Sequence, residues 1–174
     1  HCARGDVKAT AAFVVVGPAP ARPDPRFGVC CAVYDPAVSA RKIRDLGVGS
    51  LRVHGPLTWN RLMPRRGTFN PPLRLLKTLK ASGAEVMSYV HGLPPPWVRE
   101  ETGEVFDLDA ARRMITRVAE ATSTLVDQYE IYNEPNSCAP FGSAPGAYAA
   151  WLATAYDAVK SVSPTTGVIG ICSG

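Results

Sequence analysis

The chain has 174 residues, of which 46% are hydrophobic and 20% charged, and its formal net charge is +4. This composition is typical of one globular domain that is long enough to bury a substantial core. The basic residues are scattered and no apolar run is as long as a membrane span, so we expect neither a nucleic-acid-binding protein nor a transmembrane protein.

The first 26 residues are expected to form a leader and a linker outside the folded domain. Residues 9–16, ATAAFVVV, resemble the end of a signal peptide, but we favour a short strand or a disordered leader. Residues 17–26 contain four prolines, a composition that favours a stiff, extended linker. We therefore expect the organised domain to begin near Phe27.

Short apolar runs alternate with helix-like segments in the rest of the chain. The expected strands are residues 27–33, 50–53, 85–90, 129–133 and 168–172. This alternation predicts βαβ units and a parallel sheet covered by helices. Two architectures fit, an open doubly wound sheet or part of a (β/α)8 barrel. The first strand is not followed by GxGxxG, which disfavours the dinucleotide-binding version of the open sheet.

The expected helices follow the first four strands. The first helix is expected to begin at Asp35-Pro36, the second near Pro72, and the third after Asp107 or Asp109. The fourth is expected to end at Ser163-Pro164. The third is the clearest, because its apolar residues fall at i, i+3, i+4, i+7 and i+8. The segments around Trp59 and Trp97 are expected to be loops.

The five cysteines predict neither a disulfide framework nor a zinc site, because their number is odd, two are adjacent and no CxxC spacing occurs. Cys30, Cys31 and Cys172 lie in apolar runs, so we expect them to be small core residues. No metal and no other cofactor is expected.

Polar and aromatic residues follow three successive strands, at the ends where parallel α/β folds form their sites. Taken singly, His54 and His91 are more simply loop histidines. Trp59 and Trp97 fit either lids over apolar surface or platforms for a sugar ring. Arg52 lies in the middle of a strand, where a buried guanidinium needs a partner carboxylate. The cluster is therefore more informative than any of its members.

The stretch from residue 129 to 136, YEIYNEPN, ends a buried strand on polar groups. Pro135 biases Glu134 toward an extended backbone. Strand alternation would send Asn133 and Glu134 to opposite faces, so both reach one pocket only if the backbone twists or bulges there. The residues alone fit two interpretations of Asn133 and Glu134 equally well: a turn, or a pair of site residues.

YEIYNEPN resembles the fourth-strand motif of the clan A glycoside hydrolases, whose catalytic domains are (β/α)8 barrels. FGVCCAVYDP, GVGSLRVHGPLTWNRLMPRRGTFN and SYVHGLPPPW resemble the first three strand segments of that clan. The motif is similar to those of family 39 and of the family 5-like group. The resemblance covers residues 27–174 and implies the N-terminal portion of a (β/α)8 barrel, with about five β/α units.

This resemblance implies a retaining O-glycosyl hydrolase that acts on poly- or oligosaccharides. Glu134 would be the general acid/base, and Asn133 would bind the sugar hydroxyl next to the reacting carbon. Arg52 would hold the nucleophile carboxylate, while His91 and Trp97 would line the sugar subsite. The partner would be a carbohydrate, and export from the cytoplasm would suit a polysaccharide substrate.

The chain departs from the clan pattern in one respect. In that clan the nucleophile carboxylate lies at the end of the seventh strand, and only five strands are expected in this chain. The carboxylates of Glu100, Glu101 and Glu104 fall in one stretch that we expect to be solvated. The simplest interpretation is the N-terminal part of a longer enzyme. The alternative is a truncated barrel that binds a carbohydrate or a partner without catalysis. A barrel enzyme of other chemistry, such as a phosphate-sugar isomerase, lacks a phosphate-binding glycine loop here.

Overall fold

The computed structural model describes residues 24–31, 36–103, 105–137 and 141–170. Its strands are β1 (Asp24–Cys31), β2 (Val48–Thr58), β3 (Glu85–His91), β4 (Gln128–Ile131) and β5 (Gly167–Ile169). Its helices are α1 (Pro36–Leu46), α2 (Trp59–Leu62), α3 (Leu73–Lys80), α4 (Pro96–Thr102), α5 (Leu108–Thr122) and α6 (Pro145–Val162), with a 3₁₀ turn η1 (Phe141–Ser143). None of these helices is long and apolar enough to cross a membrane.

The sheet is parallel throughout, and its strands lie side by side in chain order, β1-β2-β3-β4-β5. A doubly wound sheet reverses its strand order at a switch point, and this sheet has no such reversal. Each new strand is instead added on the same side, as in the winding of a (β/α)8 barrel. The structure thus decides between the two expected architectures in favour of a partial barrel.

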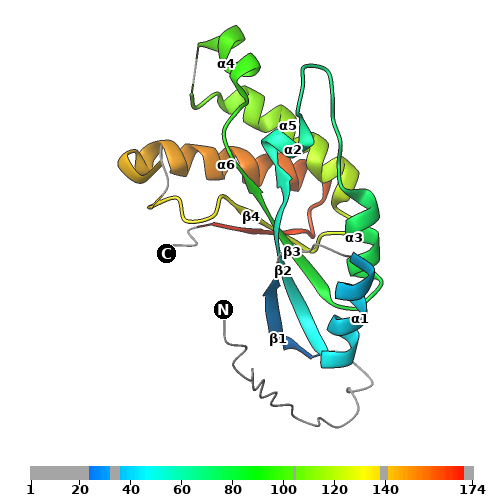
Figure 1. The fold of residues 1–174 in the computed structure, drawn as a ribbon. Helices are drawn as coiled ribbons and strands as arrows, with labels where there is room; N and C mark the ends of the chain where they lie inside the picture. The colour runs from blue at the N-terminus through cyan, green and yellow to red at the C-terminus, as the bar shows by residue number, and fades with distance from the viewer. Residues whose placement is uncertain (1–23, 32–35, 104, 138–140, 171–174) are drawn as a thin grey trace, which may run out of the picture.

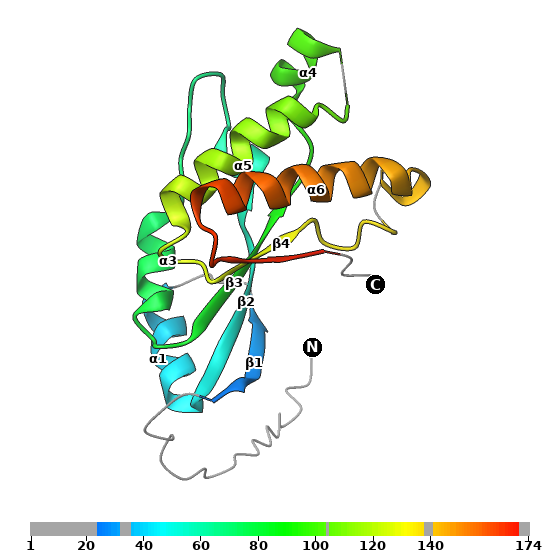
Figure 2. The same ribbon diagram turned by 180° about the vertical axis from the view of Figure 1, so that it is seen from behind.

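The longer helices form one layer over one face of the sheet (Figures 1 and 2). In that layer α1 packs against α3, α3 against α5, and α5 against α6. The strands fan out strongly, from β1 and β2 near vertical to β5 near horizontal in Figure 1, as the twist of a parallel sheet requires. None of the helices of the described residues lies over the other face of the sheet in either view.

The hydrophobic core lies between the sheet and this helix layer. Alternate strand residues supply it, among them Val53 of β2, Val86 of β3 and Ile131 of β4, each 0% exposed. They meet Ile115 and Val118 of α5, which form the buried stripe of that helix. Burial of this apolar area is the main favourable contribution to folding.

Most of the expected elements are confirmed, and the differences are local. α5 is capped by Asp107, whose Oδ1 accepts a 2.7 Å hydrogen bond from the backbone N–H of Ala110. β1 begins at Asp24 rather than at Phe27. The loops expected around Trp59 and Trp97 were wrong, because both tryptophans begin or enter short helices, α2 and α4. Pro96 at the first position of α4 is a favourable start that the run of prolines obscured.

Candidate functional site

The face of the sheet that bears no helix carries the polar strand residues, and we call it the open face. Along β2 the burial alternates, so that Leu51 and Val53 turn toward the helices and Arg52 turns to the other side. The open face is made by Cys30 of β1, Arg52 and His54 of β2, Tyr89 and His91 of β3, and Glu130 of β4.

Arg52 is the centre of the open face. Its Nε and Nη2 donate to the two carboxylate oxygens of Glu130, each at 2.6 Å, and Nη2 also donates to Asn133 Oδ1 at 2.6 Å. Its Nη1 donates to His54 Nε2 at 2.7 Å and to Cys30 Sγ at 3.4 Å. A guanidinium has five N–H donors, so every donor of Arg52 has a partner.

Arg52 and Glu130 form a charge-paired unit with little access to water. The side chain of Arg52 is 21% exposed and that of Glu130 is 0% exposed. The hydrogen bonds to Glu130 raise the pKa of Arg52 above its ordinary value, although burial acts against this. The guanidinium therefore stays charged, and its plane is fixed by the two parallel bonds to the carboxylate.

Asn133 and His91 are joined at the carboxyl end of the strands. The backbone N–H of Asn133 donates to His91 Nδ1 at 3.3 Å, so Nδ1 is the unprotonated nitrogen of the imidazole. Burial lowers the pKa of His91, opposed in part by the negative charge of Glu130. The neutral imidazole therefore carries its proton on Nε2.

The backbone around Asn133 is irregular, so strand alternation does not hold there. Tyr132 has a φ of 68° and Glu134 a φ of 50°, both in the left-handed region that non-glycine residues rarely adopt. The extended backbone expected for Glu134 before Pro135 was therefore wrong. The carbonyl of Glu134 accepts a 3.1 Å hydrogen bond from Ser137 N–H, which closes a turn after the strand. Glu134 itself is half-buried.

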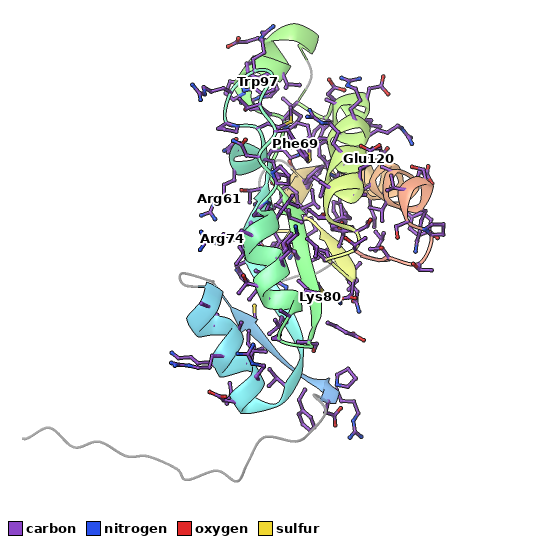
Figure 3. The ribbon with its side chains drawn as sticks, turned by 90° about the vertical axis from the view of Figure 1, so that its right-hand side faces the viewer. Arg61, Phe69, Arg74, Lys80, Trp97 and Glu120 are labelled. Carbon is purple, nitrogen blue, oxygen red and sulfur yellow. The ribbon has the colours of Figure 1, made fainter. Side chains whose placement is uncertain are left out.

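Trp97 lies apart from this cluster. It lines a cavity of about 220 Å³ between α2, α4 and α5, together with Trp59, Met63, Arg113 and Arg117. In Figure 3 Trp97 lies toward the α4 end of the molecule, away from Lys80 at the end of α3. Hydrogen bonds join Arg52, Asn133 and His91, whereas none of these three residues lines the cavity of Trp97.

Two expectations for single residues are corrected or refined by the structure. Cys30 is not a core residue, because it is exposed on the open face with its Sγ 2.8 Å from His54 Nε2. The side chain of Cys31 and all of Cys172 lie outside the described residues. Trp59 is 1% exposed and packs near Trp151, with ring centroids 6.2 Å apart, so it is a core residue rather than a platform.

Glu130 and Tyr89 are the residues of the open face that the sequence did not point to, and Glu130 is the one that pairs with Arg52. The sequence feature that could have identified Glu130 is a carboxylate in the middle of a strand, between the core residues Tyr129 and Ile131. Arg52 gave the complementary signal, a guanidinium in mid-strand that needed a carboxylate. Within the described ranges, no three His, Cys, Asp or Glu side chains gather as a metal site would need.

No family model and no curated protein matches the sequence. Among solved structures, a family 39 glycoside hydrolase from the gut symbiont Bacteroides cellulosilyticus WH2 is 20% identical, with a TM-score of 0.66 over 88% of this chain and 34% of its own. An exo-β-1,4-mannosidase from Opitutaceae bacterium strain TAV5 is 18% identical, with a TM-score of 0.64 over 84% and 32%. A β-glucosidase from Exiguobacterium marinum is 21% identical, with a TM-score of 0.56 over 75% and 35%.

The chain has part of a (β/α)8 barrel fold, which these glycoside hydrolases share. It spans about a third of the length of these three structures. Its parallel strands in chain order and its single helix layer are the partial barrel expected from the motifs. The fold expected from YEIYNEPN, part of a (β/α)8 barrel, is confirmed by this similarity.

Proposed function

We propose that the protein is a retaining glycoside hydrolase, and that this chain supplies its general acid/base and part of its sugar site. The observation that carries the proposal is the Arg52–Glu130 pair, which holds Asn133 directly before Glu134 at the carboxyl end of β4. Structural neighbours that are glycoside hydrolases support the same reading. Carboxyl ends of barrel strands are where such enzymes place their catalytic residues.

The proposed reaction needs two carboxyl groups with different roles. Glu134 would give its proton to the glycosidic oxygen as the bond to the anomeric carbon breaks, and a second carboxylate would bond to that carbon. Glu134 would then take a proton from water, whose oxygen releases the sugar from the second carboxylate. Glu130 is unsuited to this second role because Arg52 occupies both of its oxygens. We therefore assign the nucleophile to a part of the protein outside this chain.

The remaining residues have separate proposed roles. Asn133 would bind the sugar hydroxyl next to the reacting carbon, and His91 would line the same subsite. Trp97 would line a sugar subsite only if the substrate extends to its cavity, which a rise in KM without loss of kcat in Trp97→Ala would support. Since the neighbours include a β-glucosidase and an exo-β-1,4-mannosidase, we propose β-linked glycosides as the substrates.

The test of the proposed function is Glu134→Gln in the whole protein. An amide gives no proton, so we expect kcat to fall by roughly 10²–10⁴-fold with an alkyl or phenyl β-glycoside. The loss should be much smaller with a dinitrophenyl glycoside, whose leaving group departs without protonation. Glu100→Gln is the matched control, because Glu100 is exposed on α4.

Other outcomes of this experiment separate the competing functions. Equal losses with both leaving groups would remove Glu134 from the role of acid. Sugar binding by the wild-type protein without any hydrolysis, retained in Glu134→Ala, would favour a binding module. Absence of both binding and hydrolysis across β-glucosides, β-mannosides and β-xylosides would contradict a carbohydrate-active protein.

A further inference from the structure

Glu130 is a buried carboxylate whose two oxygens both bind Arg52. It is 0% exposed in the middle of β4, and each of its two oxygens accepts a 2.6 Å hydrogen bond from Arg52. A buried carboxylate is costly unless it is paired and hydrogen-bonded, so the pair is held in this bidentate geometry. The plane of the guanidinium is thereby fixed relative to β4.

The fixed guanidinium determines where the side chain of Asn133 points. The two hydrogens of Nη2 lie in the guanidinium plane, one directed at Glu130 Oε1 and the other at Asn133 Oδ1. An amide that turns its oxygen to Arg52 must turn its NH₂ group the other way. A lysine at position 52 could not make this fork, because its ammonium is a single point charge.

His91 presents the same kind of group beside Asn133. Its Nδ1 accepts the backbone N–H of Asn133, which leaves Nε2–H as the outward group. Among the described residues, neither Asn133 Nδ2 nor His91 Nε2 has a hydrogen-bond partner. Two adjacent side chains therefore present donors, and a ligand that meets them must supply acceptors.

We propose that Glu130 is a positioning residue that acts through Arg52 to fix the amide of Asn133 as a donor, so that the site selects a sugar hydroxyl oxygen and rejects an ammonium group at that position. This inference rests on the proposed function and deepens it. All five donors of Arg52 are engaged by this chain, so Arg52 serves the orientation of Asn133 first. A nucleophile carboxylate would reach Arg52 only by displacing His54 or Cys30.

The experiment compares two substrates across variants of the whole protein. With an aryl β-glycoside that has a 2-hydroxyl, we expect Glu130→Gln to lower kcat/KM by roughly 10- to 100-fold, as misplacement of a binding group does. With the matching 2-deoxy glycoside, which has nothing for Asn133 to bind, the same substitution should change kcat/KM by less than about 3-fold. Asn133→Ala should show the same dependence, and adding Glu130→Gln to it should cost little more.

The ion pair of Lys80 and Asp127 is the matched control. Asp127 lies just before β4 and Lys80 ends α3, with Lys80 Nζ 2.6 Å from Asp127 Oδ1. Asp127→Asn should change kcat/KM equally for both substrates, because the Asp127 side chain bonds to Lys80 and to the backbone of Val86 rather than to Asn133 or Arg52. Equal losses for both substrates in Glu130→Gln, at an unfolding midpoint like that of Asp127→Asn, would show a purely structural role and overturn the inference.

A spectroscopic readout separates this inference from the proposed function. The side-chain amide of Asn133 gives a pair of ¹⁵N–¹H signals, assigned through Asn133→Asp. We expect Glu130→Gln to shift this pair and Arg52→Lys to shift it further. Unchanged signals would overturn the positioning role whatever the activity. Shifted signals in a protein that hydrolyses no glycoside would retain the positioning role and reject the proposed function.

Discussion

The two faces of the sheet are built on opposite principles, and β2 shows both. The side chains of Leu51 and Val53 are apolar, and the two residues are 1% and 0% exposed where they pack under the helices. Arg52, which lies between them, faces the other way, and all five of its N–H groups donate hydrogen bonds to side chains of the open face or to Asn133. The helix-covered face is held by buried area, which is non-directional. The open face is held by geometry and charge pairing, which are directional.

This difference teaches where the chain tolerates change. A buried aliphatic side chain on the helix-covered face responds to a loss of volume, whichever atoms are lost. A group of the open face responds to the loss of its partner, because the remaining charge is left buried and unpaired. The comparison predicts different responses to substitution on the two faces.

The largest effect is expected on the helix-covered face. Ile131 is 0% exposed in β4, and Ile131→Ala should lower the free energy of unfolding by about 3–4 kcal/mol, through lost transfer energy and a residual cavity. Urea unfolding followed by circular dichroism measures this. Leu46→Ala is the control, since Leu46 is 63% exposed and should change stability by less than about 0.5 kcal/mol. A similar small effect at Ile131 would contradict a packed core there.

The next effect tests whether the open face is governed by pairing. Glu130→Leu leaves Arg52 without its carboxylate and should lower the free energy of unfolding by about 2–3 kcal/mol, a value below that of a fully buried pair because Arg52 is 21% exposed. Replacing both members, Arg52→Met with Glu130→Leu, should restore most of this loss. The same urea titration checks it. If the double variant loses the sum of the two single losses, the open face behaves like a packed core and the comparison fails.

The helix-covered face was largely predictable from sequence, whereas the open face was not. The apolar spacing from Ala111 to Ala119 was sufficient for the buried stripe of α5, since hydrophobic periodicity is local. The partner of Arg52 depends on register. Arg52 and Glu130 are 78 residues apart in the chain, and strand β3 lies between their strands. A sequence shows that a mid-strand arginine needs a carboxylate, but not which one reaches it.

Local rules failed where tertiary contacts overrode them. The extended preference of a residue before proline predicted the wrong backbone for Glu134, which has a φ of 50°. Tyr132, two residues before it and also with positive φ, is held between the rings of His91 and Phe141, with centroids 4.2 and 4.8 Å away. Such contacts offset a conformation that costs about 1–3 kcal/mol. Strained backbone beside Asn133 fits its proposed place in a site.

The smallest effect concerns a polar group on the helix-covered face. Tyr129 is 0% exposed, and its hydroxyl lies 2.7 Å from Thr122 Oγ1. Thr122 uses its own proton on the carbonyl of Val118, so the Tyr129 hydroxyl is the donor of the shared bond. Burial raises the pKa of Tyr129 to about 12, against an ordinary value of 10.0. Ionisation is therefore disfavoured in the folded state.

This fixes how stability should change with pH. Between pH 10 and about 12 the unfolded chain loses this proton and the folded chain keeps it, so the free energy of unfolding falls as pH rises. Tyr129→Phe should cost about 1 kcal/mol at neutral pH but show a flatter decline above pH 10, so the two curves converge. Tyr156→Phe, at a residue that is 50% exposed, should leave the wild-type slope unchanged. Parallel curves for Tyr129→Phe and wild type would contradict the raised pKa of Tyr129, and with it the burial of this hydroxyl on the helix-covered face.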